Sequence, residues 1–181
     1  ANRGEVIQPR MLKEVDGVPF EPWNDDPEPD IFASDDDYWR YIHEAMTMVV
    51  HRPFSDVFRD YGTAYESIAM QDQTMPYMMA GKSGTSQVVG ISQEILSSED
   101  IVVSDLNKDH GLFVSFAPAM HPTTDPKIAV AVFVENGEHG SSVAGPIAKR
   151  VIDTYLLDIL QLDFHAADLE AAVAIVTQLN E

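Results

Sequence analysis

The stretch that decides the fold reads Lys82-Ser83-Gly84-Thr85-Ser86-Gln87, in the middle of the strand-like segment MPYMMAGKSGTSQVVG at residues 75–90. Apolar residues alternate in two further segments, at residues 110–118 and 127–135, which indicates two more strands. The connection MHPTTDP at residues 120–126 is rich in turn residues and joins these two strands as a hairpin. We therefore expect an antiparallel sheet of about three core strands.

Helices are expected to pack on this sheet. Ser34 can cap a helix that runs to about His51, with an apolar face at Trp39, Ile42, Met46, Val49 and Val50. A second helix begins near Ser141 or Ser142 and has an apolar stripe at Val143, Ile147, Val151, Tyr155 and Ile159, widened by Ile152 and Leu156. Residues 166–179 predict a third helix. With a short N-terminal strand at residues 6–12, the fold class is α+β, an antiparallel sheet packed with helices.

Charge and composition exclude several functions. The chain has 181 residues and a formal net charge of −19, so its field repels nucleic acids and anionic membrane surfaces. It has no cysteine, which excludes disulfides and thiolate chemistry. Residues 13–37 combine ten acidic residues with four prolines, which predicts an extended, solvated loop. The aspartates of this loop lack the spacing of a calcium-binding loop.

The cluster at Lys82–Thr85 carries the clearest chemistry. A phosphate-binding loop would need a glycine where Pro76 stands and a helix after the motif, so nucleotide binding is rejected. We expect the strand to bind an acyl substrate: Lys82 supplies a positive charge, and Ser83 and Thr85 place two hydroxyls on one side of the strand. Gly84 leaves room for a ligand backbone, and a free N–H here could serve an oxyanion hole. On these four residues alone, a polar edge strand without chemistry stays equally open.

The segment K-S-G-T-S-Q resembles the K-[ST]-G-T-[AS]-Q motif of class B penicillin-binding proteins, the serine D,D-transpeptidases that cross-link peptidoglycan. Other stretches match the family in the same order, and they are Gly62-Thr63-Ala64, residues 109–113, residues 116–118, residues 128–137 and residues 142–155. The ordered set is most similar to the elongation branch, penicillin-binding protein 2. The resemblance covers roughly residues 1–158.

The resemblance implies a role for each motif residue. The catalytic residues are expected to be Lys82, which holds the network of active-site hydroxyls, and Thr85, whose backbone N–H forms half of the oxyanion hole. Ser83, Gly84 and Thr85 are expected to bind the terminal carboxylate of a D-Ala-D-Ala stem peptide or of a β-lactam. Serine acyl transfer needs neither a metal nor an organic cofactor, so none is expected. The implied partners are elongation-machinery membrane proteins, and the implied location is the periplasm, with an inner-membrane anchor outside this chain.

Two family motifs do not occur in the sequence. No serine is followed three residues later by lysine, and none is followed two residues later by asparagine. Both motifs precede K-[ST]-G in family order, so residues 1–158 are expected to be the C-terminal part of a transpeptidase domain, with a helical extension at residues 159–181. We expect the isolated chain to form no acyl-enzyme. We also expect it to expose an apolar sheet face that the missing N-terminal part of the same protein would cover.

Three alternatives stay open. A division-type transpeptidase shares K-[ST]-G-T, although the Asp109-His110 pair and the end of the last strand at Glu135-Asn136-Gly137 favour elongation. A non-catalytic β-lactam-binding receptor would bind without turnover. A purely structural domain would use the acidic residues 13–37 as its contact surface.

Overall fold

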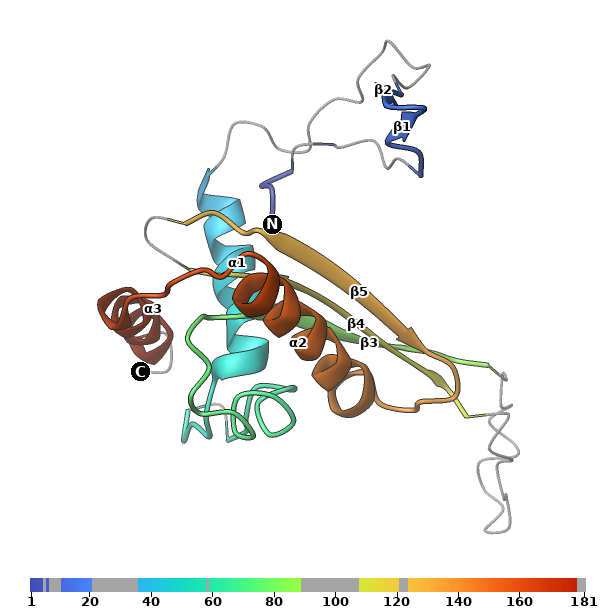
Figure 1. Ribbon diagram of the computed structural model, residues 1–181. Helices are drawn as coiled ribbons and strands as arrows, with labels where there is room; N and C mark the ends of the chain where they lie inside the picture. The colour runs from blue at the N-terminus through green and yellow to red at the C-terminus, as the bar shows by residue number, and fades with distance from the viewer. Residues whose placement is uncertain are drawn as a thin grey trace.

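The computed structural model describes residues 1–4, 6, 11–20, 36–57, 59–88, 108–120 and 124–178. The helical and strand elements follow one another in the order β1 (Glu14–Val15), β2 (Val18–Pro19), α1 (Asp36–His51), β3 (Ala80–Ser86), β4 (His110–Ala117), β5 (Ile128–Val134), η2 (Gly140–Ala144), α2 (Gly145–Asp153), η3 (Thr154–Ile159) and α3 (Ala166–Gln178). Here η2 and η3 are π-helical turns at the two ends of α2. Figure 1 shows α2 lying along the three long strands, with α1 crossing them near one end.

The central sheet has the order β3-β4-β5, and both pairings are antiparallel. Lys82 lies opposite Val114, and Ser83 lies opposite Phe113. The prediction of three antiparallel strands, with a hairpin formed by the last two, is confirmed. The first strand is shorter than predicted, because it begins at Ala80 instead of residue 75.

Helices cover the two faces of the sheet to different extents. Phe113 is fully buried on one face, in a cluster with Ala144, Ala148 and Ile152 of η2 and α2. On the opposite face, the buried pair Ala80 and Phe116 packs against methionines of α1. The helix α1 reaches only the Ala80 end of that face, so the rest of it is open: Val114 and Phe133 are 46% and 53% exposed. This agrees with the predicted apolar sheet face.

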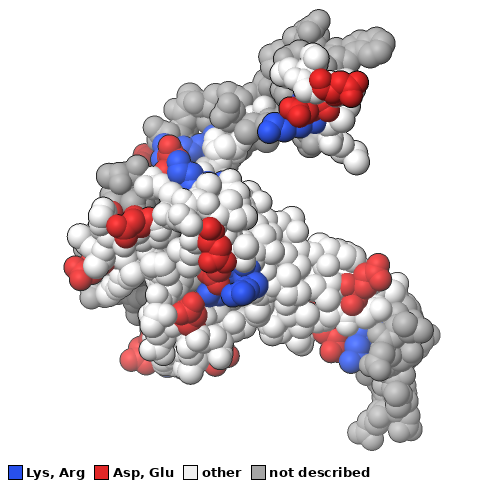
Figure 2. All heavy atoms as spheres, viewed as in Figure 1, with Lys and Arg blue, Asp and Glu red and all other residues white. Residues whose placement is uncertain are grey.

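The predicted core stripe of the second helix was right at Ile152 and Leu156, which are buried, and wrong at most of its other main positions. Val143, Ile147, Val151 and Ile159 are exposed, and the buried residues are Ala144, Ala148, Ile152 and Leu156. Both sets repeat every four residues, but only the alanines let the helix approach closely enough to pack on Phe113. Figure 2 shows the result as a band of mostly uncharged surface over α2 and β5, next to a small group of charged side chains. In α1, Ile42 is likewise 44% exposed instead of buried.

The N-terminal region also departs from prediction. Residues 14–19 are not an extended loop, because β1 and β2 form a small exposed hairpin. Its two turn residues, Asp16 and Gly17, have φ of 51° and 79°, the conformation that favours tight hairpins. Residues 21–35, with Ser34, and most of the proposed strand at 6–12 lie outside the described residues. Within the described chain, no helix has the length and apolar character needed to cross a bilayer.

Candidate functional site

Strand β3 carries all four predicted site residues on the border of the sheet. Its inner edge pairs with β4, while its outer edge pairs with no strand of the described chain. Lys82 and Thr85 are exposed, and Ser83 and Gly84 are partly buried. The hydroxyls are therefore not enclosed in the hydrophobic interior, and the whole segment is accessible from the outer edge.

The strand pleat separates the lysine from the two hydroxyls. Directly paired residues in an antiparallel sheet share a face, so Lys82 lies on the face of Val114, whereas Ser83 and Thr85 lie on the face of Phe113. One ligand can meet all three groups only if it lies along the outer edge of β3. The Lys82 Nζ already bends back to this edge, because it donates a 2.6 Å hydrogen bond to the Ser83 carbonyl oxygen.

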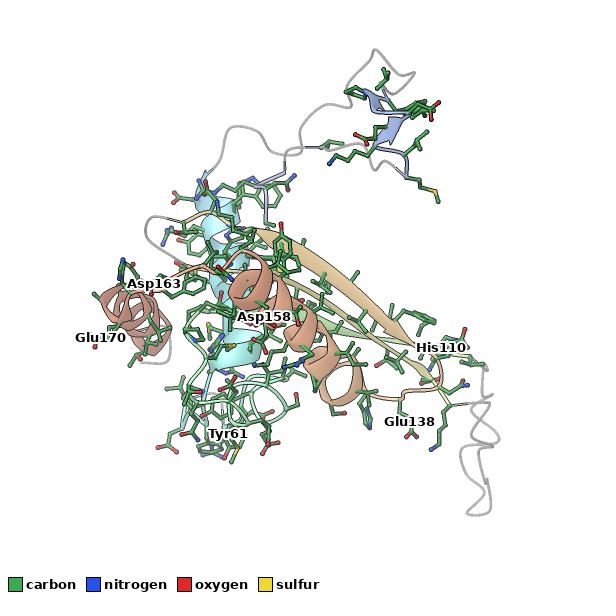
Figure 3. All side chains as sticks on the ribbon, viewed as in Figure 1. Tyr61, His110, Glu138, Asp158, Asp163 and Glu170 are labelled. Carbon is green, nitrogen blue, oxygen red and sulfur yellow. The ribbon has the colours of Figure 1, made fainter. Side chains whose placement is uncertain are left out.

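The turn that follows β5 bonds to the start of β4, beside the far end of β3. The backbone N–H of Asn136 donates to His110 Nδ1 at 2.9 Å, and His110 stands opposite Ser86. Figure 3 shows His110 and Glu138 close to this end of the sheet. Glu138 pairs with Lys108 at 3.5 Å. These contacts fix the turn beside the strand that carries the site residues.

Gly140 makes the closest approach to the site strand. A Cβ on Gly140 would clash with the Leu112 carbonyl oxygen and lie 2.7 Å from the Gly84 carbonyl oxygen. Only glycine fits here without displacing a backbone. The sequence offered a signal for this position, because Gly140 closes the turn after Glu135-Asn136-Gly137, but sequence reasoning did not assign it a role.

A partly buried polar network holds the segment that leads into β3. The Tyr77 hydroxyl donates to Asp153 Oδ1 at 2.5 Å, and Lys149 Nζ lies 2.7 Å from both Asp153 Oδ2 and Asp72 Oδ2. Burial, reinforced by Asp153, raises the pKa of Tyr77 far above its ordinary value. Hydrogen bonds from Lys149 and Thr74 lower the pKa of Asp72. Burial opposes the charge of Lys149, but Asp153 and Asp72 outweigh it and leave its pKa above the ordinary value.

Two histidines that could have been metal ligands have other partners. His51 Nε2 accepts the Met79 N–H at 2.9 Å, and the His43 ring packs on Phe116 at 4.8 Å between centroids. Among the described residues, no three His, Asp or Glu side chains are grouped to hold a metal ion. A cavity of about 330 Å³ is lined in part by Arg40, His43 and Met120, away from residues 82–85. The candidate site is therefore the β3 edge.

Comparisons with known proteins identify the family to which this chain belongs. The profile of the family described as "Penicillin binding protein transpeptidase domain" matches residues 1–153. Because the match covers most of the chain, the protein belongs to this family.

The curated relatives are named peptidoglycan D,D-transpeptidases. The peptidoglycan D,D-transpeptidase MrdA of Acinetobacter baumannii is 37% identical over 158 residues, which are 87% of this chain and 20% of the relative. MrdA of Escherichia coli is 31% identical over 175 residues, 96% of this chain and 25% of the relative. The chain thus spans a fifth to a quarter of the length of these curated relatives.

A solved structure agrees with the sequence comparison. Pseudomonas aeruginosa PBP2, crystallised in complex with WCK 5153, superposes with a TM-score of 0.62 at 39% identity. The superposition covers 92% of this chain and 30% of the PBP2 chain. The predicted resemblance to the elongation branch of class B penicillin-binding proteins is confirmed.

Proposed function

We propose that this chain supplies the substrate-binding strand of a peptidoglycan D,D-transpeptidase of the elongation type. The observation that carries the proposal is the placement of Lys82, Ser83 and Thr85 on the open edge of β3, in a chain whose relatives are named D,D-transpeptidases. An acyl donor lying along this edge meets an ammonium from one face and two hydroxyls from the other. Its chemistry fits the carboxylate end of a D-Ala-D-Ala stem peptide or of a β-lactam.

The acyl transfer divides between this chain and residues outside it. A serine Oγ attacks the carbonyl of the penultimate D-Ala, the peptide bond breaks, and the terminal D-Ala leaves with a proton. The backbone N–H of Thr85 is proposed to donate to the developing oxyanion, and Ser83 and Thr85 to hold the terminal carboxylate across the space opened by Gly84. Removing one oxyanion-hole donor typically costs about 10²–10³ in rate. Lys82 is proposed to hold the hydroxyls of the nucleophilic motifs in place.

The nucleophile is proposed to reach β3 over the open sheet face. Lys82 stands on that face, beside Val114, and Phe133 continues it on β5. An apolar face next to a catalytic lysine suits a segment that buries these side chains and brings a serine to Lys82. Without such a segment, the isolated 181-residue chain is expected to form no acyl-enzyme. By the same family resemblance, we place the complete enzyme in the periplasm, anchored in the inner membrane, in contact with membrane proteins of the elongation machinery.

A chimera tests this function. The segment of P. aeruginosa PBP2 that superposes on this chain is replaced by the chain itself, and the product is incubated with a fluorescent penicillin. We expect one label per chimera, at least tenfold slower labelling with Lys82→Met, and no change with Lys127→Met, which removes an exposed lysine outside β3. Equal labelling of the two lysine variants, or covalent labelling of the isolated chain, would contradict the proposal.

A further inference from the structure

A side-chain contact from α1 is one of the bonds that hold the entry to the site strand. Met79 immediately precedes β3 and is fully buried. Its N–H is not part of the β3–β4 ladder, which begins at Ala80, and it donates instead to Nε2 of His51, the last residue of α1, at 2.9 Å. Only Ala80 and Gly81 lie between Met79 and Lys82.

We infer that His51 is a positioning residue for the substrate strand. Its neutral imidazole fixes the position of Met79 relative to α1, and therefore the position of Lys82–Thr85, which follow on the same strand. An acceptor on Nε2 requires the ring proton to sit on Nδ1, so the ring is the neutral Nδ1–H tautomer. Burial lowers the pKa of His51 to about 4, which keeps this tautomer in place at neutral pH.

The neighbouring contacts show how this bond adds to the packing of α1 on Ala80. Just before Met79, the Met78 carbonyl oxygen accepts the Ala119 N–H at 2.7 Å, which holds the chain to the end of β4. Around the end of α1, the Ala64 N–H donates to the Val49 carbonyl oxygen at 2.8 Å, and a Cβ on Gly62 would clash with the carbonyl oxygens of the last turns. The end of α1 is thus held in place by residues 62–64, and the hydrogen bond from Met79 to His51 ties the entry of β3 to it.

Loss of the imidazole would leave a buried N–H without an acceptor. Such a group destabilises the local structure by an amount that corresponds to roughly 5- to 150-fold in an opening equilibrium. The opening should affect residues 79–86 first, because β4 and β5 remain paired with each other. The inference rests on the proposed function only in treating β3 as the substrate strand.

Amide hydrogen exchange on the full 181-residue chain, followed by mass spectrometry, tests the positioning role. His51→Leu should speed exchange in residues 79–86 about 5- to 150-fold, with much less change in β5 (Ile128–Val134). His51→Gln, whose amide oxygen can occupy the place of Nε2, should restore slow exchange. Thr47→Val is the matched control: it removes a buried hydroxyl of the same helix, which bonds only within α1, and should leave β3 unchanged.

A uniform rise in exchange over β3 and β5 would overturn the inference, because a histidine with only a general structural role destabilises all parts of the fold equally. Failure of His51→Gln to restore slow exchange would overturn it as well. The two proposals can fail separately. In the PBP2 chimera, His51→Leu should slow penicillin labelling and His51→Gln should restore it. If His51→Leu speeds exchange locally as expected but the chimera is never labelled by penicillin, the transpeptidase function is contradicted and the positioning role stands.

Discussion

The hydroxyl of Tyr77 offers the sharpest test of what holds the site strand to the rest of the fold. Tyr77 is 1% exposed, its hydroxyl donates to Asp153 of α2, and its ring packs on Phe164 at 5.6 Å between centroids. Tyr77→Phe keeps the ring and this packing but removes the hydroxyl that bonds to α2. The change isolates one hydrogen bond between the entry to β3 and the helix behind the sheet.

The magnitude follows from the charge of the acceptor. Hydrogen bonds to charged groups contribute about 1.5–3 kcal/mol, more than neutral pairs. Asp153 keeps Lys149 as a partner after the substitution, so the carboxylate is not left without a donor, and the lower half of this range is expected. For a protein of this size, 1 kcal/mol shifts Tm by about 2–4 °C, so Tyr77→Phe should lower Tm by roughly 3–9 °C.

Urea and thermal unfolding of the 181-residue chain measure the effect, with Tyr41→Phe as the control. Tyr41 is 59% exposed on α1, so removing its hydroxyl should change the free energy of unfolding by less than about 0.5 kcal/mol. If Tyr77→Phe is no more costly than Tyr41→Phe, the network does not hold the site strand and the reasoning fails.

The same pair predicts a pH dependence. Burial and Asp153 raise the pKa of Tyr77 in the folded chain, whereas the unfolded value is about 10. The stabilisation is therefore fully present below pH 10 and is lost as pH rises above it, because only the unfolded tyrosine gives up its proton there. Tyr77→Phe should remove this alkaline loss, whereas Tyr41→Phe should keep it.

Three further predictions concern the fold and the site. Burial lowers the pKa of His51 to about 4, while the unfolded value stays near 6.5, so the free energy of unfolding should fall as the pH is lowered from about 6.5 to about 4. In urea unfolding at several pH values, His51→Gln should reduce the dependence of this free energy on pH by the equivalent of one proton. Gly140→Ala should cost about 1–3 kcal/mol in urea unfolding, because its methyl group displaces the Gly84 or Leu112 carbonyl; an unaffected midpoint would contradict the close approach. Ile152→Ala should cost about 2–5 kcal/mol and Ile147→Ala less than about 0.5 kcal/mol; the reverse order would show that the exposed stripe of α2 is the true core.

The sheet could be predicted from the sequence because its signals are local. Residues 110–118 and 127–135 alternate along the chain, and a turn-rich connection separates them, so each strand and the hairpin follow from neighbouring residues. On the second helix, Ile152 and Leu156 were predicted in the core, but the alanines of the buried face were not. The stripe that starts at Val143 and the stripe that starts at Ala144 both repeat every four residues. Which of them is buried depends on the packing against Phe113, a residue that the helix meets only after folding.

The sequence predicts which residues form the candidate site, but not how they are arranged, and their roles stay a prediction. Lys82, Ser83 and Thr85 were found from their chemistry and from the family pattern, and the structure places them on an open edge. The separation of the lysine from the hydroxyls across the pleat also follows from spacing, but its consequence, a ligand along the edge, depends on β3 being the border strand. The contacts of His51 with Met79 and of Tyr77 with Asp153 join residues that are far apart in the sequence, so no local sequence pattern predicts them.

Acylation of the PBP2 chimera by benzylpenicillin and by its methyl ester measures most directly whether the β3 edge binds an anionic carboxylate. The ester keeps the reactive ring but lacks the negative charge, so the account predicts that the acid reacts faster by about 10- to 150-fold, the equivalent of a charged hydrogen bond. Substituting Ser83→Ala together with Thr85→Val should bring the two rates close together, mainly by slowing the acid. An acid-to-ester ratio that these substitutions leave unchanged would contradict the claim that β3 holds the carboxylate.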